Sequence, residues 1–223
     1  MKVKRLKFAS LFITVLLLIS PANAAGSLNV QSMDGQSNRP YLEYSYSYPR
    51  ITGLGDSINQ QHVNVRLKER AMKAVKSAEL ASQTATEGSA IKGSFGFNVK
   101  RNDGGILSIE LNETLTGNSS PVLLREGMNI DTVSGKILKL QDLFKENADY
   151  KGLISDIVKK QLKTTGLDKK QLREFKTINN YEEFYLTQNE LVILPEPGKY
   201  FSQKSGIIEF VISLKSLEES LKP

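Results

Sequence analysis

The sequence predicts an α+β fold in which a largely antiparallel sheet packs against two longer helices and a short C-terminal helix. Strand-like and helix-like segments come in blocks, without a regular βαβ alternation. A strong hairpin turn, Asn102-Asp103-Gly104-Gly105, joins two alternating segments in the middle of the chain. Two long segments repeat apolar residues at helical spacing.

The first predicted strand covers residues 41–49. Leu42, Tyr44, Tyr46 and Tyr48 fall on one face of it, and polar side chains fall on the other. Pro49 is expected to end the strand or to place it at an edge of the sheet, since proline cannot donate a backbone hydrogen bond.

The first predicted helix begins at Asp56 or Ser57, after a glycine turn, and runs to about Gln83. Its alanines predict close packing against a sheet. His62 is expected to lie at the boundary of the core or inside it. The expected apolar stripe consists of Val65, Ala71, Met72, Val75 and Ala78.

The remaining elements follow from alternation and turn signals. We expect strands at 90–101 and 106–115, at 128–133 and 137–140 around a tight turn, at 184–187 and 191–194, and at 207–213. A second helix is predicted from about Asp149 to Thr164. We also expect a short helical turn capped by Asp142 and a closing helical segment at 214–221.

The N-terminus has the three parts of a secretory signal peptide. Lys2, Lys4, Arg5 and Lys7 precede an apolar run, and a small-x-small site ends at Ala24. The run is about a dozen residues, short of the roughly 20 that span a bilayer. We therefore expect cleavage near Ala24 and a periplasmic or extracellular location without stable membrane insertion; the alternative is a retained anchor.

Composition narrows the classes of partner and chemistry. Removing residues 1–24 lowers the number of basic residues from 30 to 26 and leaves the 24 acidic residues unchanged. No strong positive charge therefore remains to favour binding to nucleic acid. The chain has no cysteine and one histidine. Disulfides, thiolate metal sites and His-rich zinc sites are thereby excluded, and we expect no metal and no cofactor.

Candidate catalytic groups are few. A serine nucleophile needs a general base, and His62 has no acid at an obvious orienting spacing. We therefore expect a protein that is not an enzyme. A glycan hydrolase with paired carboxylates is the alternative, and its candidate acids are Asp131, Asp142, Asp149, Glu182, Glu183 and Glu196.

Aromatic side chains are the candidate binding residues. Tyr44, Tyr46 and Tyr48 form either a stacking platform for sugar rings or a half-buried sheet face. Tyr200 and Phe201 follow a Pro-Glu-Pro-Gly loop, and rings at a loop tip suit the binding of a partner, although they also fold back as plugs.

Several blocks together resemble a secreted domain of unknown function. That domain forms the extracellular part of the lysozyme-sensing anti-sigma-V factor, and a similar one precedes the catalytic domain of a peptidoglycan deacetylase. The resemblance rests on YPRITGLGDSINQQ at 48–61, ILSI at 106–109, NID at 129–131, SGK at 134–136, LQDLF at 140–144, FYLT at 184–187 and the closing strand and helix at 209–217. It implies an envelope-binding domain whose partner is a cell-wall glycan or a lysozyme-like protein.

Two loops depart from the pattern of that domain, namely 117–120 (Gly-Asn-Ser-Ser) and 194–198 (Leu-Pro-Glu-Pro-Gly). Both are expected on the surface, so the fold should survive while ligand specificity changes. The expected organisation is a signal peptide at 1–24, a polar linker at 25–40, and α+β subdomains at 41–120 and 121–223. A structural or chaperone-like periplasmic protein is a further alternative to the binding domain.

Overall fold

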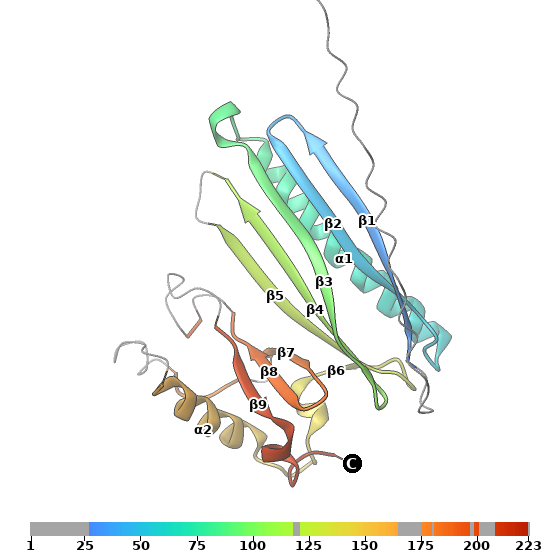
Figure 1. Ribbon diagram of the computed structural model, residues 1–223, viewed down its shortest axis with the longest axis vertical. Helices are drawn as coiled ribbons and strands as arrows, with labels where there is room; N and C mark the ends of the chain where they lie inside the picture. Colours follow the sequence, from blue (N-terminus) through green and yellow to red (C-terminus); the bar gives the residue numbers. More distant parts are fainter. Residues whose placement is uncertain are drawn as a thin grey trace, which may run out of the picture.

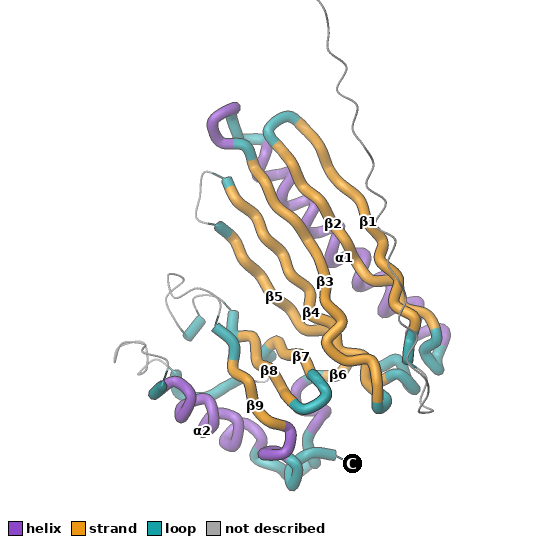
Figure 2. The backbone as a smooth tube through the Cα atoms, viewed as in Figure 1, coloured by secondary structure: helices purple, strands orange, loops and turns teal. Residues whose placement is uncertain are grey.

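The protein has two packed lobes, each built from a sheet and a helix (Figure 1). The computed structural model describes residues 27–117, 121–164, 175–179, 181–196, 199–200 and 208–222. The predicted signal peptide at 1–24 lies outside them. Within these residues most of the regular structure is strand, with two α-helices and short 3-10 turns (Figure 2). This confirms the predicted α+β class.

The large lobe contains a curled sheet of six strands in the order β1-β2-β3-β4-β5-β6. Neighbouring strands are antiparallel except β2 and β3, which pair in parallel over residues 42–46 and 91–95. The strands are β1 Asn29–Arg39, β2 Leu42–Thr52, β3 Ile91–Asp103, β4 Ile106–Thr116, β5 Val122–Asp131 and β6 Ile137–Leu138.

Helix α1, Ser57–Ser82, joins the two parallel strands and covers one face of the large sheet (Figure 1). Its N-cap is Asp56, whose carboxylate accepts a hydrogen bond from the Asn59 backbone N–H at 2.8 Å. Small side chains bring the helix close to the sheet, as predicted. The residues of α1 that are buried are Val63, Leu67, Ala71, Ala74, Ala78 and Ser82.

Val65 differs from the expectation, because 45% of its surface is exposed, and His62 is exposed as well. The helix is rotated so that the row containing Val63, Leu67 and Ala71 faces the sheet. The apolar residues of α1 are compatible with two rows at helical spacing, the expected one and the observed one. Packing against the sheet determines which row is buried.

Strand β4 is buried on both faces. Leu107, Ile109 and Leu111 belong to the core beneath α1, whereas Ser108 and Glu110 are buried on the opposite face, where the small lobe docks. Its alternation of apolar and polar residues therefore does not mark an inside and an outside. It marks one apolar interface and one polar interface.

The small lobe packs helix α2, Tyr150–Leu162, against an antiparallel sheet of three strands, β7 Glu183–Leu186, β8 Glu190–Leu194 and β9 Phe210–Ser213. Asp149 is the N-cap of α2. Asp142, predicted as an N-cap, instead lies inside the 3-10 turn Leu140–Leu143 and accepts from the Lys139 N–H at 2.8 Å. The predicted closing helix is a 3-10 turn, Leu214–Leu217.

The lobes meet where the free edge of β7 rests on the face of the large sheet. The Ser108 hydroxyl accepts from the Leu186 N–H at 2.8 Å and donates to the Asn129 Oδ1 at 2.6 Å. The Asn129 Nδ2 donates to the Phe184 carbonyl at 2.7 Å. All of these bonds are buried. We call Ser108, Asn129 and the backbone of Phe184 and Leu186 the clasp.

The polar linker predicted at 25–40 is wrong for residues 29–39, which form β1 and pair with the whole of β2. Edge-strand pairing comes from backbone hydrogen bonds, so β1 needs no apolar alternation, and most of its side chains are exposed. Tyr41, at a φ of 60°, completes the tight turn between the two strands. The subdomain boundary expected at 120 and 121 falls between β4 and β5, which are paired neighbours.

Pro49 lies inside β2 and does not end it. It is tolerated there because β2 pairs with β3 only as far as Tyr46 and has β1 as its partner beyond that point.

Gly127→Ala should disrupt the docking of the two lobes. A Cβ at Gly127 would lie 1.6 Å from the Phe184 carbonyl oxygen, which is fixed in the clasp. We expect a loss of about 3 kcal/mol in the free energy of unfolding, measured by urea denaturation.

Gly96→Ala is the matched control. Gly96 lies on the same face of the sheet, in β3, and an added Cβ would meet no atom within 4 Å. We expect this variant to be unchanged or stabilised by about 0.5 kcal/mol. Equal stability of the two variants would show that the close approach at Gly127 is not a constraint.

Candidate functional site: a hollow between β1, β2 and α1

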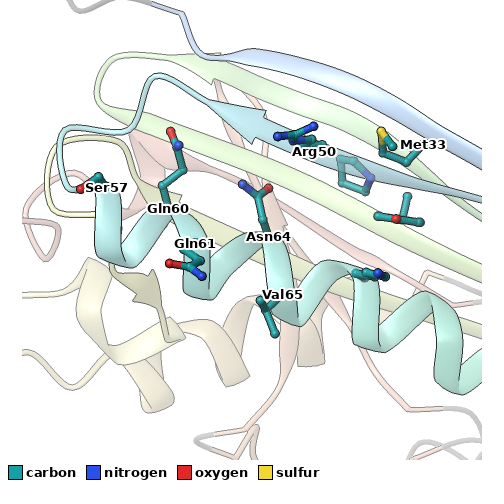
Figure 3. A pocket seen from close by; sticks show the side chains of 10 residues that line it. Met33, Arg50, Ser57, Gln60, Gln61, Asn64 and Val65 are labelled. Carbon is teal, nitrogen blue, oxygen red and sulfur yellow. The ribbon is translucent and has the colours of Figure 1, made fainter.

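An open hollow of about 410 Å³ lies between helix α1 and strands β1 and β2 (Figure 3). The helix supplies six of its ten lining residues and the strands supply four. The lining residues are Met33, Tyr48, Pro49, Arg50, Ser57, Gln60, Gln61, Asn64, Val65 and Lys68. Polar and charged side chains predominate, and the ten include no acid, histidine or cysteine.

The hollow forms where β2 parts from β3. Past Tyr46 the backbone of β2 has no strand on that side, and side chains of α1 take the place of a neighbouring strand. Asn64 accepts from the Ile51 N–H at 2.7 Å and donates to the Ile51 carbonyl at 2.8 Å. Gln60 accepts from the N–H groups of Gly53 and Leu54 at 2.8 and 3.1 Å. The lining is therefore rigid on the helix side.

Other polar groups of the lining remain available to a ligand. Within the described residues, Arg50 and Lys68 take part in no ion pair, and the side chains of Ser57 and Gln61 make no hydrogen bond. All four residues are exposed. The hollow thus combines two unpaired cations with hydroxyl and amide groups, and its shape and chemistry suit binding.

The predicted tyrosine stripe is mainly part of the core. Tyr44 is 1% exposed, and its hydroxyl has no hydrogen-bond partner among the described residues. Burial, reinforced by the charge of Glu113, raises the pKa of Tyr44, so the hydroxyl stays protonated. Tyr46 and Tyr48 are half-buried and stack at 6.4 Å between ring centroids. Of the three, Tyr48 lines the hollow.

Tyr200 turns inward instead of standing at a loop tip. Its ring packs edge-on against Phe175 with centroids 5.0 Å apart, and its hydroxyl donates to the buried carboxylate of Glu182. Burial and this hydrogen bond raise the pKa of Tyr200. The structure thus gives the ring a packing role, and its role in binding stays a prediction. Phe201 lies outside the described residues.

Most of the acids considered for glycan hydrolysis have structural partners. Asp131 accepts from the Val133 and Ser134 N–H groups at 3.1 and 2.7 Å, and these bonds, led by that of Ser134, lower its pKa. Glu182 accepts from Lys199 at 3.0 Å, and Glu183 accepts from the Gly127 N–H at 3.0 Å. Glu196 is exposed. None of them lines the hollow.

A deeply buried charge lies between the lobes. Glu110 is 2% exposed, and it binds Lys100 at 2.8 Å and Arg125, which also reaches Glu209 at 2.9 Å. Burial by itself would raise the pKa of Glu110, but the hydrogen bonds from Lys100 and Arg125 outweigh it and hold the pKa below its ordinary value. Glu110 is therefore a charged structural contact.

The part of the chain that the structure describes forms neither a three-ligand metal cluster nor a membrane-spanning helix. No group of three His, Cys, Asp or Glu residues there is arranged to hold a metal ion. None of its helices combines the length and the hydropathy that crossing a membrane requires.

The blocks that carry the family resemblance meet in space as scaffolding. The Gly55 N–H donates to the Thr132 carbonyl at 3.1 Å, and Asn59 donates to the Ser134 carbonyl at 2.8 Å, so the block at 48–61 is bonded to the turn that contains the block at 134–136. The clasp joins the blocks that contain Ser108, Asn129 and Leu186. The altered loops at 117–120 and 194–198 are described only in part, and the described residues of both lie outside the lining of the hollow.

Comparison with known proteins identifies the same scaffold. Residues 141–215, which cover α2 and the small sheet, match the family described as a protein of unknown function, DUF3298. A solved member of that family from Bacteroides fragilis NCTC 9343 is 14% identical, with a TM-score of 0.64 over 89% of this chain and 95% of that chain. A DUF3298 family protein from Pseudomonas aeruginosa PAO1 is 13% identical, with a TM-score of 0.64 over 89% and 96%. No curated protein matches.

Glu110→Gln should destabilise the fold in a pH-dependent way. At pH 7 we expect a loss of about 2 kcal/mol, since the variant leaves Lys100 without its carboxylate and Arg125 with that of Glu209 alone. The folded-state pKa of Glu110 is lowered, so its charge stabilises the fold above the unfolded value of about 4.3, and this contribution disappears as the pH falls through the folded-state pKa.

The free energy of unfolding in urea, measured from pH 7 down to pH 3, checks this expectation. The difference between wild type and Glu110→Gln should narrow below about pH 4. Glu218→Gln, at an exposed position after β9, controls for the loss of one carboxylate. A difference that stays constant with pH would contradict the structural role of the charge.

Proposed function

We propose that this protein works outside the cytoplasmic membrane as a binding domain, not as an enzyme, and that it recognises a component of the cell envelope through the hollow between β1, β2 and α1. The observation that carries the proposal is the lining of that hollow. It offers two cations, amides, a hydroxyl and a tyrosine ring on a rigid wall, and it contains no acid or histidine to transfer a proton.

The type of ligand comes from the sequence resemblance. The blocks from Tyr48 to Leu217 resemble the extracellular domain of the lysozyme-sensing anti-sigma-V factor and the domain that precedes a peptidoglycan deacetylase. The proposed ligands are accordingly peptidoglycan, a lysozyme-like protein or another envelope protein. The proposal requires no cofactor, no nucleic acid and no stable membrane insertion.

The hydrolase and chaperone-like alternatives have less support. The acids Asp131, Glu182 and Glu183 hold backbone or side-chain donors in place, as described above. A chaperone-like protein that binds through a sheet edge would use β1, which has a strand on one side only.

Export gives the first test. Cells that express the full chain should release a protein whose N-terminus is at or near Ala25, because the small-x-small site ends at Ala24. N-terminal sequencing of the protein from the envelope or culture fraction checks this. A protein that begins at Met1 and stays with the inner membrane would contradict the proposed location.

Gln61→Trp tests the site. A bulky ring at this exposed lining position should fill the hollow and lower co-sedimentation with insoluble peptidoglycan, or retention on immobilised lysozyme, by roughly ten-fold. The assay compares bound and free protein over a range of ligand concentrations.

His62→Trp is the matched control, since His62 is the next residue of α1, is also exposed, and does not line the hollow. It should bind as the wild type does. Equal binding by Gln61→Trp and wild type would place the binding surface elsewhere, and failure of the wild type to bind either ligand would remove both as candidates.

A further inference from the structure

The fold determines which hydrogen-bonding groups the hollow offers to a ligand. Backbone N–H groups can only donate, so the Gln60 oxygen must face Gly53 and Leu54, and the Asn64 oxygen must face Ile51. The oxygens of both amides are therefore already bonded to backbone N–H groups. The Gln60 Nε2 has no hydrogen-bond partner in the described part of the chain and is left to donate. Gln60 therefore presents a donor to a ligand, whereas the nitrogen of Asn64 already donates to the Ile51 carbonyl.

Positive charge gathers in the same place. Arg50 on β2 and Lys68 on α1 both line the hollow, and neither forms an ion pair within the described residues. Several other exposed cations, among them Arg66 and Lys73, also form no ion pair within the described residues, whereas two largely buried arginines are neutralised. Arg70 binds Glu113 and Glu126, and Arg125 binds Glu110 and Glu209. A hollow that contains two unneutralised cations and no carboxylate favours an anionic ligand.

The hollow is long and has an apolar side. Ser57 and Lys68 are eleven positions apart on α1, which corresponds to roughly 16 Å along the helix axis. Met33, Pro49 and Val65 contribute apolar surface, and Tyr48 contributes part of its ring. In Figure 3, Gln60 and Asn64 point from the helix toward the strands, where Arg50 and Met33 lie. Such a surface suits an extended ligand that carries charge on a carbon skeleton.

We propose that the hollow recognises an anionic, extended envelope polymer, whose carboxylate or phosphate groups bind Arg50 and Lys68 while its carbon skeleton lies against Met33, Val65 and the ring of Tyr48. This deepens the proposed function and rests on it. The shared chemistry is a negatively charged oxygen group. Two wall sources can supply it, namely the carboxylates of peptidoglycan stem peptides and the phosphates of wall-attached polymers.

The test uses the full chain as cells process it, with insoluble cell-wall material as the probe. Arg50→Gln and Lys68→Gln should each lower binding roughly three-fold, and the double variant about ten-fold, because both cations are exposed and such contacts are individually modest. Wild-type binding should also weaken as salt rises, and the double variant should lose most of that dependence.

Arg66→Gln with Lys73→Gln is the matched control, since it removes two exposed cations from α1 that do not line the hollow. This variant should bind within about two-fold of the wild type, because neither side chain lines the hollow and exposed charges without direct contact contribute little. An equal loss in both double variants would mean that net charge drives binding, and the proposal would be wrong.

Chemical treatment of the wall separates the two sources. Amidation of wall carboxylates should abolish binding if the stem peptides supply the anion, and removal of phosphate polymers with hydrofluoric acid should abolish it if phosphate does. Either result supports the proposal. Binding that survives both treatments together would overturn it.

The two proposals fail in different ways. If Gln61→Trp loses binding while the Arg50→Gln/Lys68→Gln variant keeps it, the hollow binds the envelope and the anionic character of the ligand is wrong. If neither variant changes the binding of a protein that does bind the wall, the hollow is not the site and both proposals are wrong. Circular dichroism and urea unfolding confirm that each variant is folded before binding is compared.

Discussion

The structure depends on a small set of buried hydrogen bonds where the edge of one sheet meets the face of another. A strand edge carries unpaired N–H and carbonyl groups that are costly to bury. In this protein Ser108 and Asn129 satisfy the edge of β7 with bonds of 2.8 and 2.7 Å, and Gly127 lets the Phe184 carbonyl approach. Apolar contact alone would leave those groups without partners. The clasp therefore sets the position and the angle at which the small lobe docks.

Elsewhere in the fold, too, side chains satisfy backbone groups that have no neighbouring strand, and there the side chain is an amide. Asn64 pairs with both polar groups of Ile51, and Asn102 does the same for Leu28 at the start of the chain's first strand. Asparagine is suited to this role because one side chain carries both a donor and an acceptor. In the hollow, Gln60 uses only its oxygen for the backbone N–H groups of Gly53 and Leu54, so its nitrogen remains able to donate to a ligand.

Local patterns predicted most of the elements. The Asp-Gly hairpin, the Asp56 and Asp149 caps and the strand around Tyr44 are present because turn chemistry and alternation act over a few residues. The strand β1 was missed, since an exposed edge strand has no apolar period. The hollow gave no signal either. Gln61 and Arg50 look like ordinary exposed residues until β2 parts from β3 and α1 fills the gap.

The long sequence separation of the clasp has a consequence for the order of folding. Strands β3, β4 and β5 form a meander of neighbouring strands, whereas the clasp joins groups 55 and 78 positions apart. Closing such long loops costs more entropy than forming a hairpin. The small lobe can therefore dock only when groups distant in sequence have come together, whereas the strands of the β3–β4–β5 meander pair with their neighbours in sequence.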